Sequence, residues 1–233
     1  MTMVRPYMSG KVRIYFISGL GADRRVFRNL VFPTDFELMY LDWIVPLPDE
    51  LLEDYAIRLA AGIDHTTPFY LIGLSMGGMM ATEIAKKLNP IHTFLISSVP
   101  SYKQIPWYFK LAGKLKLQKM ITARLIKQAK FIPTKLLGGK TPEERVLLKT
   151  LILDSDPVFM KWALTSILEW KNSDRPENLT HIHGNKDITL PIRYCKPDVI
   201  INAAGHFMVY ANAEEISSYI LQKINAFSNK AFH

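Results

Sequence analysis

The chain has 233 residues, of which 48% are hydrophobic and 21% are charged, so it can bury a substantial core within one domain and is not disordered. Its apolar runs fall short of the roughly 18 residues that span a bilayer, and its first residues lack the apolar stretch of a signal peptide. The single cysteine, Cys195, excludes an internal disulfide and fits a reducing compartment, so we expect a cytoplasmic protein.

The net charge of +8 is unevenly distributed along the chain. Residues 101–171 contain 14 Lys and Arg against 5 Asp and Glu, an excess of +9, and the remainder is nearly neutral. A basic segment within an otherwise neutral chain indicates an insertion.

Short runs rich in β-branched and aromatic residues predict buried strands in the first part of the chain. These runs occupy residues 11–18, 36–43, 69–75 and 91–99. Helices are expected between the strands, over residues 22–30, 49–63 and 77–88. This alternation predicts right-handed crossovers and a parallel sheet covered by helices on both faces.

The pattern changes after the fourth strand, because no segment of residues 101–171 has the character of a strand. Helices are expected there over residues 107–131, 141–155 and 157–171. Strands resume at residues 178–187 and 198–206, and an amphipathic helix over residues 213–227 closes the chain. The sequence therefore predicts an α/β core domain formed by residues 1–100 and 172–233, with a doubly wound, mostly parallel sheet of about six strands. Residues 101–171 would form a helical insertion.

One serine stands where the third strand meets the following helix, within Gly73-Leu74-Ser75-Met76-Gly77. A strand that turns abruptly into a helix leaves little room beside its central residue, and glycines two positions away relieve the clash. The hydroxyl of Ser75 would then project at the carboxyl end of the sheet, where open α/β sheets bind ligands. The alternative is a tight turn that merely needs small residues.

A serine nucleophile requires a base and a group that orients the base. Asp187 and His206 follow the last two predicted strands, so both would lie at the same edge of the sheet as Ser75. A carboxylate on one ring nitrogen would leave the other nitrogen to accept the serine proton. Taken singly, Asp187 in "GNKD" is more typical of a turn aspartate, and the alternative for His206 is a loop histidine.

Stabilisation of an oxyanion requires two hydrogen-bond donors near the serine. The amide of Met76 lies at the predicted start of a helix, and the glycine-rich turn "FISGLGAD" after the first strand places the amide of Leu20 at the same sheet edge. A plain strand-to-helix turn would look the same.

The segments "FISGLGAD", "LIGLSMGG", "HGNKD" and "AAGHFMV" resemble the α/β-hydrolase fold family, and the resemblance extends over nearly all of the chain outside the insertion. It implies a catalytic triad of Ser75, Asp187 and His206, oxyanion donors at Leu20 and Met76, and no cofactor.

The resemblance further implies that the insertion over residues 101–171 is a helical cap. One departure concerns the first turn, where members usually carry His-Gly and this chain has Ser18-Gly19. Relatives that cleave carbon–halogen bonds or epoxides have aspartate in place of Ser75, so the resemblance argues against those reactions. Members with serine include esterases, thioesterases, lipases, acyltransferases, peroxidase-like enzymes and a few lyases, so the family does not determine the substrate.

Other motifs have simpler interpretations. His181 and His183 alternate along a predicted strand and could ligate a metal, although packing or a hydrogen bond near the site is the ordinary reason for such a pair. Position 24 is Arg24, so the turn at Gly19 does not complete a dinucleotide-binding motif. We therefore expect no metal and no cofactor, and interpret Cys195 as incidental.

The basic stretch over residues 110–130 combines an apolar stripe with lysines. It could cover the mouth of the active site, lie on an anionic membrane or attract an acidic substrate such as an acyl-CoA. Its lysine and aliphatic composition does not favour nucleic acid. Bulky residues suggest an apolar acyl pocket in the insertion: Trp107, Tyr108, Phe109, Phe131, Phe159, Met160, Trp162 and Trp170.

Together these features predict a serine hydrolase that acts on a small or medium ester or thioester, with no nucleic-acid partner. Two alternatives remain open. The same triad would serve an acyltransferase or a lyase if the cap excludes water, and a non-catalytic relative would bind a small ligand in the same cleft.

Overall fold

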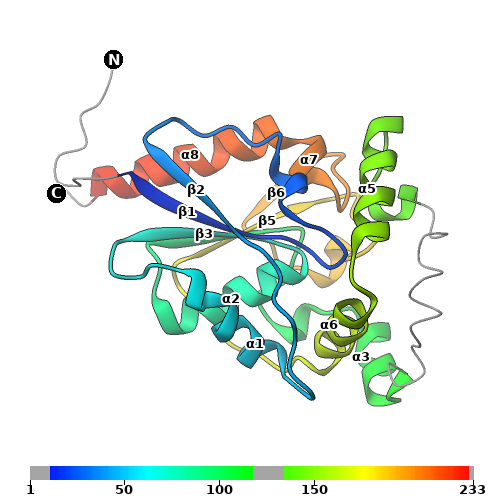
Figure 1. Ribbon diagram of the computed structural model, residues 1–233. Coiled ribbons are helices and arrows are strands. Elements are labelled where there is room, and N and C mark those ends of the chain that lie inside the picture. Colours follow the sequence, from blue (N-terminus) through cyan, green and yellow to red (C-terminus); the bar gives the residue numbers. More distant parts are fainter. Residues whose placement is uncertain (1–10, 118–133, 231–233) are drawn as a thin grey trace.

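The computed structural model describes residues 11–117 and 134–230. A six-stranded sheet forms the centre of the molecule, in the order β2-β1-β3-β4-β5-β6, and every neighbouring pair is parallel (Figure 1). The strands are β1 (Val12–Ile17), β2 (Phe36–Leu41), β3 (Phe69–Leu74), β4 (His92–Ile96), β5 (Leu179–Gly184) and β6 (Val199–Ile201). The predicted sheet is confirmed, and it is parallel throughout.

Helices cover both faces of this sheet (Figure 1). One face packs against α1 (Leu52–Leu59) and α2 (Met76–Leu88), and the other against α7 (Met208–Ala211) and α8 (Ala213–Lys230). Successive strand residues serve opposite cores, as Phe16 and Ile17 of β1 do. Burial on both faces explains why these strands have continuous hydrophobic runs instead of alternating polar residues.

The segment between β4 and β5 is helical in its described part. It contains α3 (Trp107–Lys114), the short 3-10 helix η6 (Thr134–Leu137), α5 (Pro142–Asp154) and α6 (Pro157–Glu169). Thr141 and Glu144 form a reciprocal capping box at the start of α5, and Asp156 caps α6 ahead of Pro157. In Figure 1 these helices gather beside one edge of the core.

Two predicted helices are wrong in extent. Residues 22–30 form only the 3-10 turn η1 (Arg24–Phe27), because the chain beyond it is held by distant partners: Asn29 Nδ2 donates to the carbonyl of Tyr210, and the Val31 amide donates to Ser217 Oγ.

The helix predicted over residues 107–131 ends at Lys114. Its end is set by Lys116, which adopts a left-handed backbone conformation with φ of 53°. The remaining positions of the predicted basic stripe and Phe131 lie outside the described residues.

The other limits differ by a few residues. The last predicted strand is short, since β6 ends at Ile201 and Ala203 turns the chain with φ of 56°. None of the helices in the described part of the chain combines the length and apolar character that a membrane span requires.

Candidate active site

Ser75 lies between the end of β3 and the start of α2, in a backbone conformation with φ of 52° and ψ of −120°. Few residues other than glycine adopt this region, and it persists only where neighbours enforce it. Here the Ser75 amide donates to the carbonyl of Ile96 at 2.9 Å, and the Ser75 carbonyl accepts from Ser98 Oγ at 2.6 Å. Both partners belong to β4 or to the residues just after it, so the neighbouring strand holds the turn in its strained form.

Two glycines allow the serine turn and its neighbouring backbone segments to approach this closely. A Cβ on Gly73 would lie 2.5 Å from the carbonyl oxygen of Gly77 and from the Cα of Gly78. A Cβ on Gly77 would overlap the carbonyl oxygens of Ile17 and Ser18. These obstacles are backbone atoms, which cannot move aside as a flexible side chain could. The turn therefore requires glycine at these positions for steric reasons.

The structure brings Ser75, His206 and Asp187 together at the carboxyl ends of β3, β5 and β6. His206 Nε2 lies 3.0 Å from Ser75 Oγ, and His206 Nδ1 lies 2.7 Å from Asp187 Oδ2. An ionised carboxylate only accepts hydrogen bonds, so Nδ1 carries the proton and Nε2 is free to accept from the serine hydroxyl. This is the geometry of a nucleophile, a base and a group that orients the base.

Asp187 is buried and its carboxylate is fully partnered. Oδ2 faces His206, and Oδ1 accepts from the amides of Thr189 and Leu190, each at 2.8 Å. Burial is the largest single influence on the Asp187 pKa and raises it, but the charge and hydrogen bond of His206, the Leu190 amide and nearby His183 together outweigh it. The Asp187 pKa therefore stays below its ordinary value and the carboxylate is ionised at neutral pH.

The two predicted oxyanion donors flank Ser75. Met76 is the first residue of α2, so its amide has no acceptor within the helix. Leu20 follows Gly19, and a Cβ on Gly19 would lie 3.2 Å from Ser75 Cβ, which places this turn directly against the serine. Both amides therefore belong to backbone segments that border the hydroxyl.

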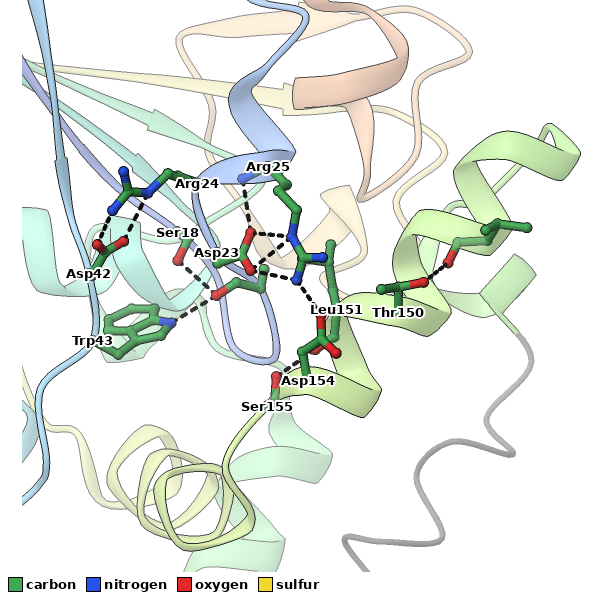
Figure 2. Close-up of polar contacts among 12 residues, drawn as sticks. Ser18, Asp23, Arg24, Arg25, Asp42, Trp43, Thr150, Leu151, Asp154 and Ser155 are labelled. Carbon is green, nitrogen blue, oxygen red and sulfur yellow. Dashed lines mark hydrogen bonds and ion pairs between the residues drawn. The ribbon is translucent and has the colours of Figure 1, made fainter.

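The side chain of Ser18 braces the turn from inside. Its Oγ donates to the carbonyl oxygen of Ala22 at 3.0 Å, and that carbonyl oxygen also accepts from Trp43 Nε1 at 2.9 Å (Figure 2). Ser18 therefore stabilises the glycine-rich turn by a local hydrogen bond.

Two cavities lie between the core and the helices of the segment from β4 to β5. The first, of about 440 Å³, borders the glycine-rich turn at Ala22 and is lined by the rings of Trp43 and Phe159, with Ser155 across from the turn. The second, of about 580 Å³, is lined in part by Trp162 and Pro46. Apolar and aromatic side chains dominate the first cavity, as in binding sites for organic ligands.

An ion-pair bridge beside the first cavity joins η1 to α5. Arg25 contacts Asp23 at 2.7 Å and Asp154 at 2.6 Å, and Figure 2 shows its guanidinium between the two carboxylates. Arg28 contacts Glu143 at 2.6 Å near the other end of α5. The segment that follows the glycine-rich turn thus holds α5 at both ends.

The sequence also offered a histidine pair as possible metal ligands and a single cysteine, and these side chains lie in different surroundings from Ser75. His181 Nε2 and His183 Nδ1 lie 3.1 Å apart and face each other. Within residues 11–117 and 134–230, no group of three or more His, Cys, Asp or Glu side chains could hold a metal ion. Cys195 is buried, and burial followed by the charge of Asp187 raises the pKa of its thiol to about 12, so it carries no thiolate at neutral pH.

Sequence reasoning missed two contacts of this site. Ser98, whose hydroxyl donates to the Ser75 carbonyl, lies just after β4. The sequence around it predicted only the end of a strand and no contact with the serine turn. His183 lies 3.4 Å from Asp187 Oδ2, and its place four residues before that carboxylate was the available signal.

The six-stranded parallel sheet with helices on both faces and the strained serine turn after β3 are consistent with the α/β-hydrolase fold, and this chain has that fold, as its motifs predicted. No protein-family model and no curated protein matches the sequence. Solved structures match at the level of the fold. MenH from S. aureus is 18% identical with a TM-score of 0.72, over 94% of this chain and 96% of that one.

Two esterases align comparably. The esterase of Exiguobacterium antarcticum is 13% identical with a TM-score of 0.73, over 94% of this chain and 93% of that one. A thermophilic esterase of Thermogutta terrifontis is 17% identical with a TM-score of 0.67, over 94% and 92% of the two chains. Identities this low establish a common fold, so the chemistry must be argued from the side chains of this protein.

Proposed function

We propose that this protein is a serine hydrolase that cleaves a small or medium carboxylic ester or thioester through an acyl-enzyme on Ser75. The observation that carries the proposal is the continuous hydrogen-bonded series from Ser75 Oγ through His206 to Asp187, with separations of 3.0 and 2.7 Å. A serine without a base is a weak nucleophile, and this series supplies the base in the required tautomer.

The reaction would proceed in two halves. His206 Nε2 accepts the hydroxyl proton as Ser75 Oγ attacks the acyl carbon, and the charge on the carbonyl oxygen is stabilised by the amides of Leu20 and Met76. His206 then gives its proton to the leaving alcohol or thiol. Water, activated by the same imidazole, releases the acyl group and restores the serine, while Asp187 stabilises the imidazolium in each half.

The choice of an ester or thioester rests on the surroundings of the site. Residues 101–171 would act as a cap, because their described part lies against the catalytic turns: a Cβ on Gly138 would lie 3.1 Å from the His206 amide, and one on Gly21 would lie 3.4 Å from Met160 Cε. The cavity beside Trp43 and Phe159 would take an apolar group of the substrate. The fold-level neighbours described as esterases support the same class of reaction.

The decisive experiment measures hydrolysis of a panel of p-nitrophenyl esters and acyl-CoA thioesters of increasing chain length. Ser75→Ala and His206→Ala should each lower kcat by roughly 10⁴-fold, which is the usual effect of losing a triad member. Ser218→Ala, at an exposed serine of α8, is the matched control and should leave turnover unchanged.

A fluorophosphonate probe provides a second readout. It should label the wild-type protein and the Ser218→Ala variant and fail to label Ser75→Ala. A Ser75→Ala protein that retains a tenth of its turnover would contradict the proposal. Including an alcohol acceptor separates hydrolysis from acyl transfer, since a transferase would form a new ester in place of the free acid.

A further inference from the structure

A buried pair of histidines lies behind the carboxylate of the proposed triad. His181 and His183 are alternate residues of β5, point to the same face of the sheet and are fully buried. His181 Nε2 lies 3.1 Å from His183 Nδ1, and His183 Nε2 lies 2.8 Å from the carbonyl oxygen of Leu190 and 3.4 Å from Asp187 Oδ2. The two rings therefore form a hydrogen-bonded series that ends at the Leu190 carbonyl, close to the aspartate.

The carbonyl of Leu190 determines the direction of this series. A carbonyl oxygen only accepts, so His183 Nε2 must carry a proton, and in the neutral ring Nδ1 must then be the acceptor. His181 Nε2 faces that acceptor and must in turn be the donor. Both rings are thus held as Nε2–H tautomers, with the donor end directed toward Leu190 and Asp187.

Both rings are also held neutral. Burial, followed by the repulsion of His183, lowers the pKa of His181 to about 3. Burial is likewise the largest influence on His183 and lowers its pKa, although Asp187 and the Leu190 carbonyl oppose it. At neutral pH the pair presents an N–H dipole to the carboxylate without adding a charge.

Leu190 connects this pair to the triad. Its carbonyl accepts from His183, and its amide donates to Asp187 Oδ1 at 2.8 Å. One residue thereby links the sheet interior to the carboxylate that orients His206. An apolar side chain at either position would pack without making these hydrogen bonds, so packing alone does not explain the pair.

We infer that His183 is a positioning residue for the triad: it donates to Leu190, whose amide holds Asp187, and His181 holds His183 in the tautomer that this requires. The inference rests on the proposed function. Without the His183 donor, the Leu190 carbonyl keeps only the weak thiol donor of Cys195 at 3.9 Å, and the segment that fixes the carboxylate is held less firmly. His206 is then less well oriented when it becomes imidazolium, so the loss falls on the chemical step and not on substrate binding.

The test compares His183→Leu with His183→Gln, whose amide nitrogen can occupy the place of the ring Nε2 and donate to Leu190. His183→Leu should lower kcat by about 10-fold to 100-fold, as expected for a misplaced catalytic group, and leave KM within about twofold. His183→Gln should restore kcat to within about threefold of wild type. Rates are expressed per site titrated with fluorophosphonate, so that loss of folded protein does not count as loss of catalysis.

His92→Leu is the matched control. His92 is another buried strand histidine, and its Nε2 lies 2.8 Å from Thr180 Oγ1, away from the triad. This variant should be less stable but keep its kcat per titrated site. Equal losses of kcat in His92→Leu and His183→Leu would overturn the inference, because they would show a general effect of removing a buried histidine.

A measurement on the wild-type protein covers the case in which His183→Leu does not fold. Nitrogen NMR of the histidine rings should show His181 and His183 as neutral Nε2–H tautomers at pH 7. A protonated ring or an Nδ1–H tautomer at His183 would overturn the inference. So would a His183→Leu protein with kcat within twofold of wild type while Ser75→Ala is inactive, whereas an active Ser75→Ala protein would instead refute the proposed function.

Discussion

Ser75 shows how much of the site depends on backbone geometry at single residues. Its φ of 52° is unfavourable for a residue with a side chain, and it is maintained by the Ile96 carbonyl and the Ser98 hydroxyl. The strain has a function in the proposed mechanism, because it directs the hydroxyl away from the sheet and toward His206. Glycine at positions 73 and 77 is the steric condition for this arrangement.

We predict that Gly77→Ala lowers the free energy of unfolding by more than about 3 kcal/mol, because the new methyl group would overlap the Ile17 and Ser18 carbonyl oxygens. Gly205→Ala is the control: its Cβ would meet its nearest atoms at 3.6 and 3.9 Å, so the change should be within about 1 kcal/mol. Urea denaturation of both variants measures the difference. Equal stabilities would show that the turn tolerates a side chain at 77.

At the scale of elements, α2 connects the serine turn to the end of the helical segment between β4 and β5. Glu83 of α2 accepts from Trp170 Nε1 at 2.7 Å, and both side chains are buried. Lys86, one turn further along, contacts Glu83 at 2.5 Å and also donates to Asn172 at 2.9 Å. The carboxylate is thus paired and hydrogen-bonded, and it holds the chain where α6 returns to the core.

Trp170→Phe should lower the free energy of unfolding by about 1–3 kcal/mol, since it leaves a buried carboxylate oxygen of Glu83 without its indole donor. Trp107→Phe makes the same chemical change at a side chain that is 61% exposed, and it should alter stability by less than about 0.5 kcal/mol. Thermal unfolding followed by circular dichroism distinguishes the two. A similar, small effect in both variants would mean that Glu83 finds another donor.

At the scale of the whole molecule, a parallel sheet buried on both faces places polar side chains of its strands in the interior. His92 and His181 are two of them, and burial is the main cause that lowers the pKa of His92 to about 4 and that of His181 to about 3. Such histidines bind a proton readily only after unfolding. The free energy of unfolding therefore depends on pH through these buried histidines as well as through titratable groups on the surface.

Stability should fall as the pH decreases from about 7.5 to about 5. The folded-state pKa of His92 is below its unfolded value of 6.5, so the unfolded chain binds more protons in this range and the stabilisation present above 6.5 is progressively lost. His92→Gln cannot titrate but can still hydrogen-bond to Thr180, and it should reduce the loss by on the order of 2 kcal/mol. Urea denaturation at both pH values, with wild type beside the variant, measures this. An unchanged pH dependence in His92→Gln would contradict burial of neutral His92.

The sequence predicted those features of the fold that depend on local patterns. The runs at 12–17 and 69–74 are apolar on both faces and lie between turn residues, so their strands were predicted to within a residue or two. The helix expected over residues 22–30 was wrong because its shortening depends on Tyr210 and Ser217, more than 180 residues away. No local pattern carries information about such partners.

The candidate site likewise has a part that the sequence predicted and a part that only the structure shows. Ser75, Asp187 and His206 each follow a strand, and the carboxyl ends of parallel strands share one edge of a sheet, so the order of residues along the chain by itself determined where these side chains had to be sought. Only the tertiary structure decided which donors hold Asp187, that Leu190 links it to His183, and that Trp43 and Phe159 line a cavity. The physical reason is that backbone conformation follows from neighbouring residues, whereas hydrogen-bond partners and cavities depend on the strand order and on how the helices between β4 and β5 pack against the sheet and its covering helices.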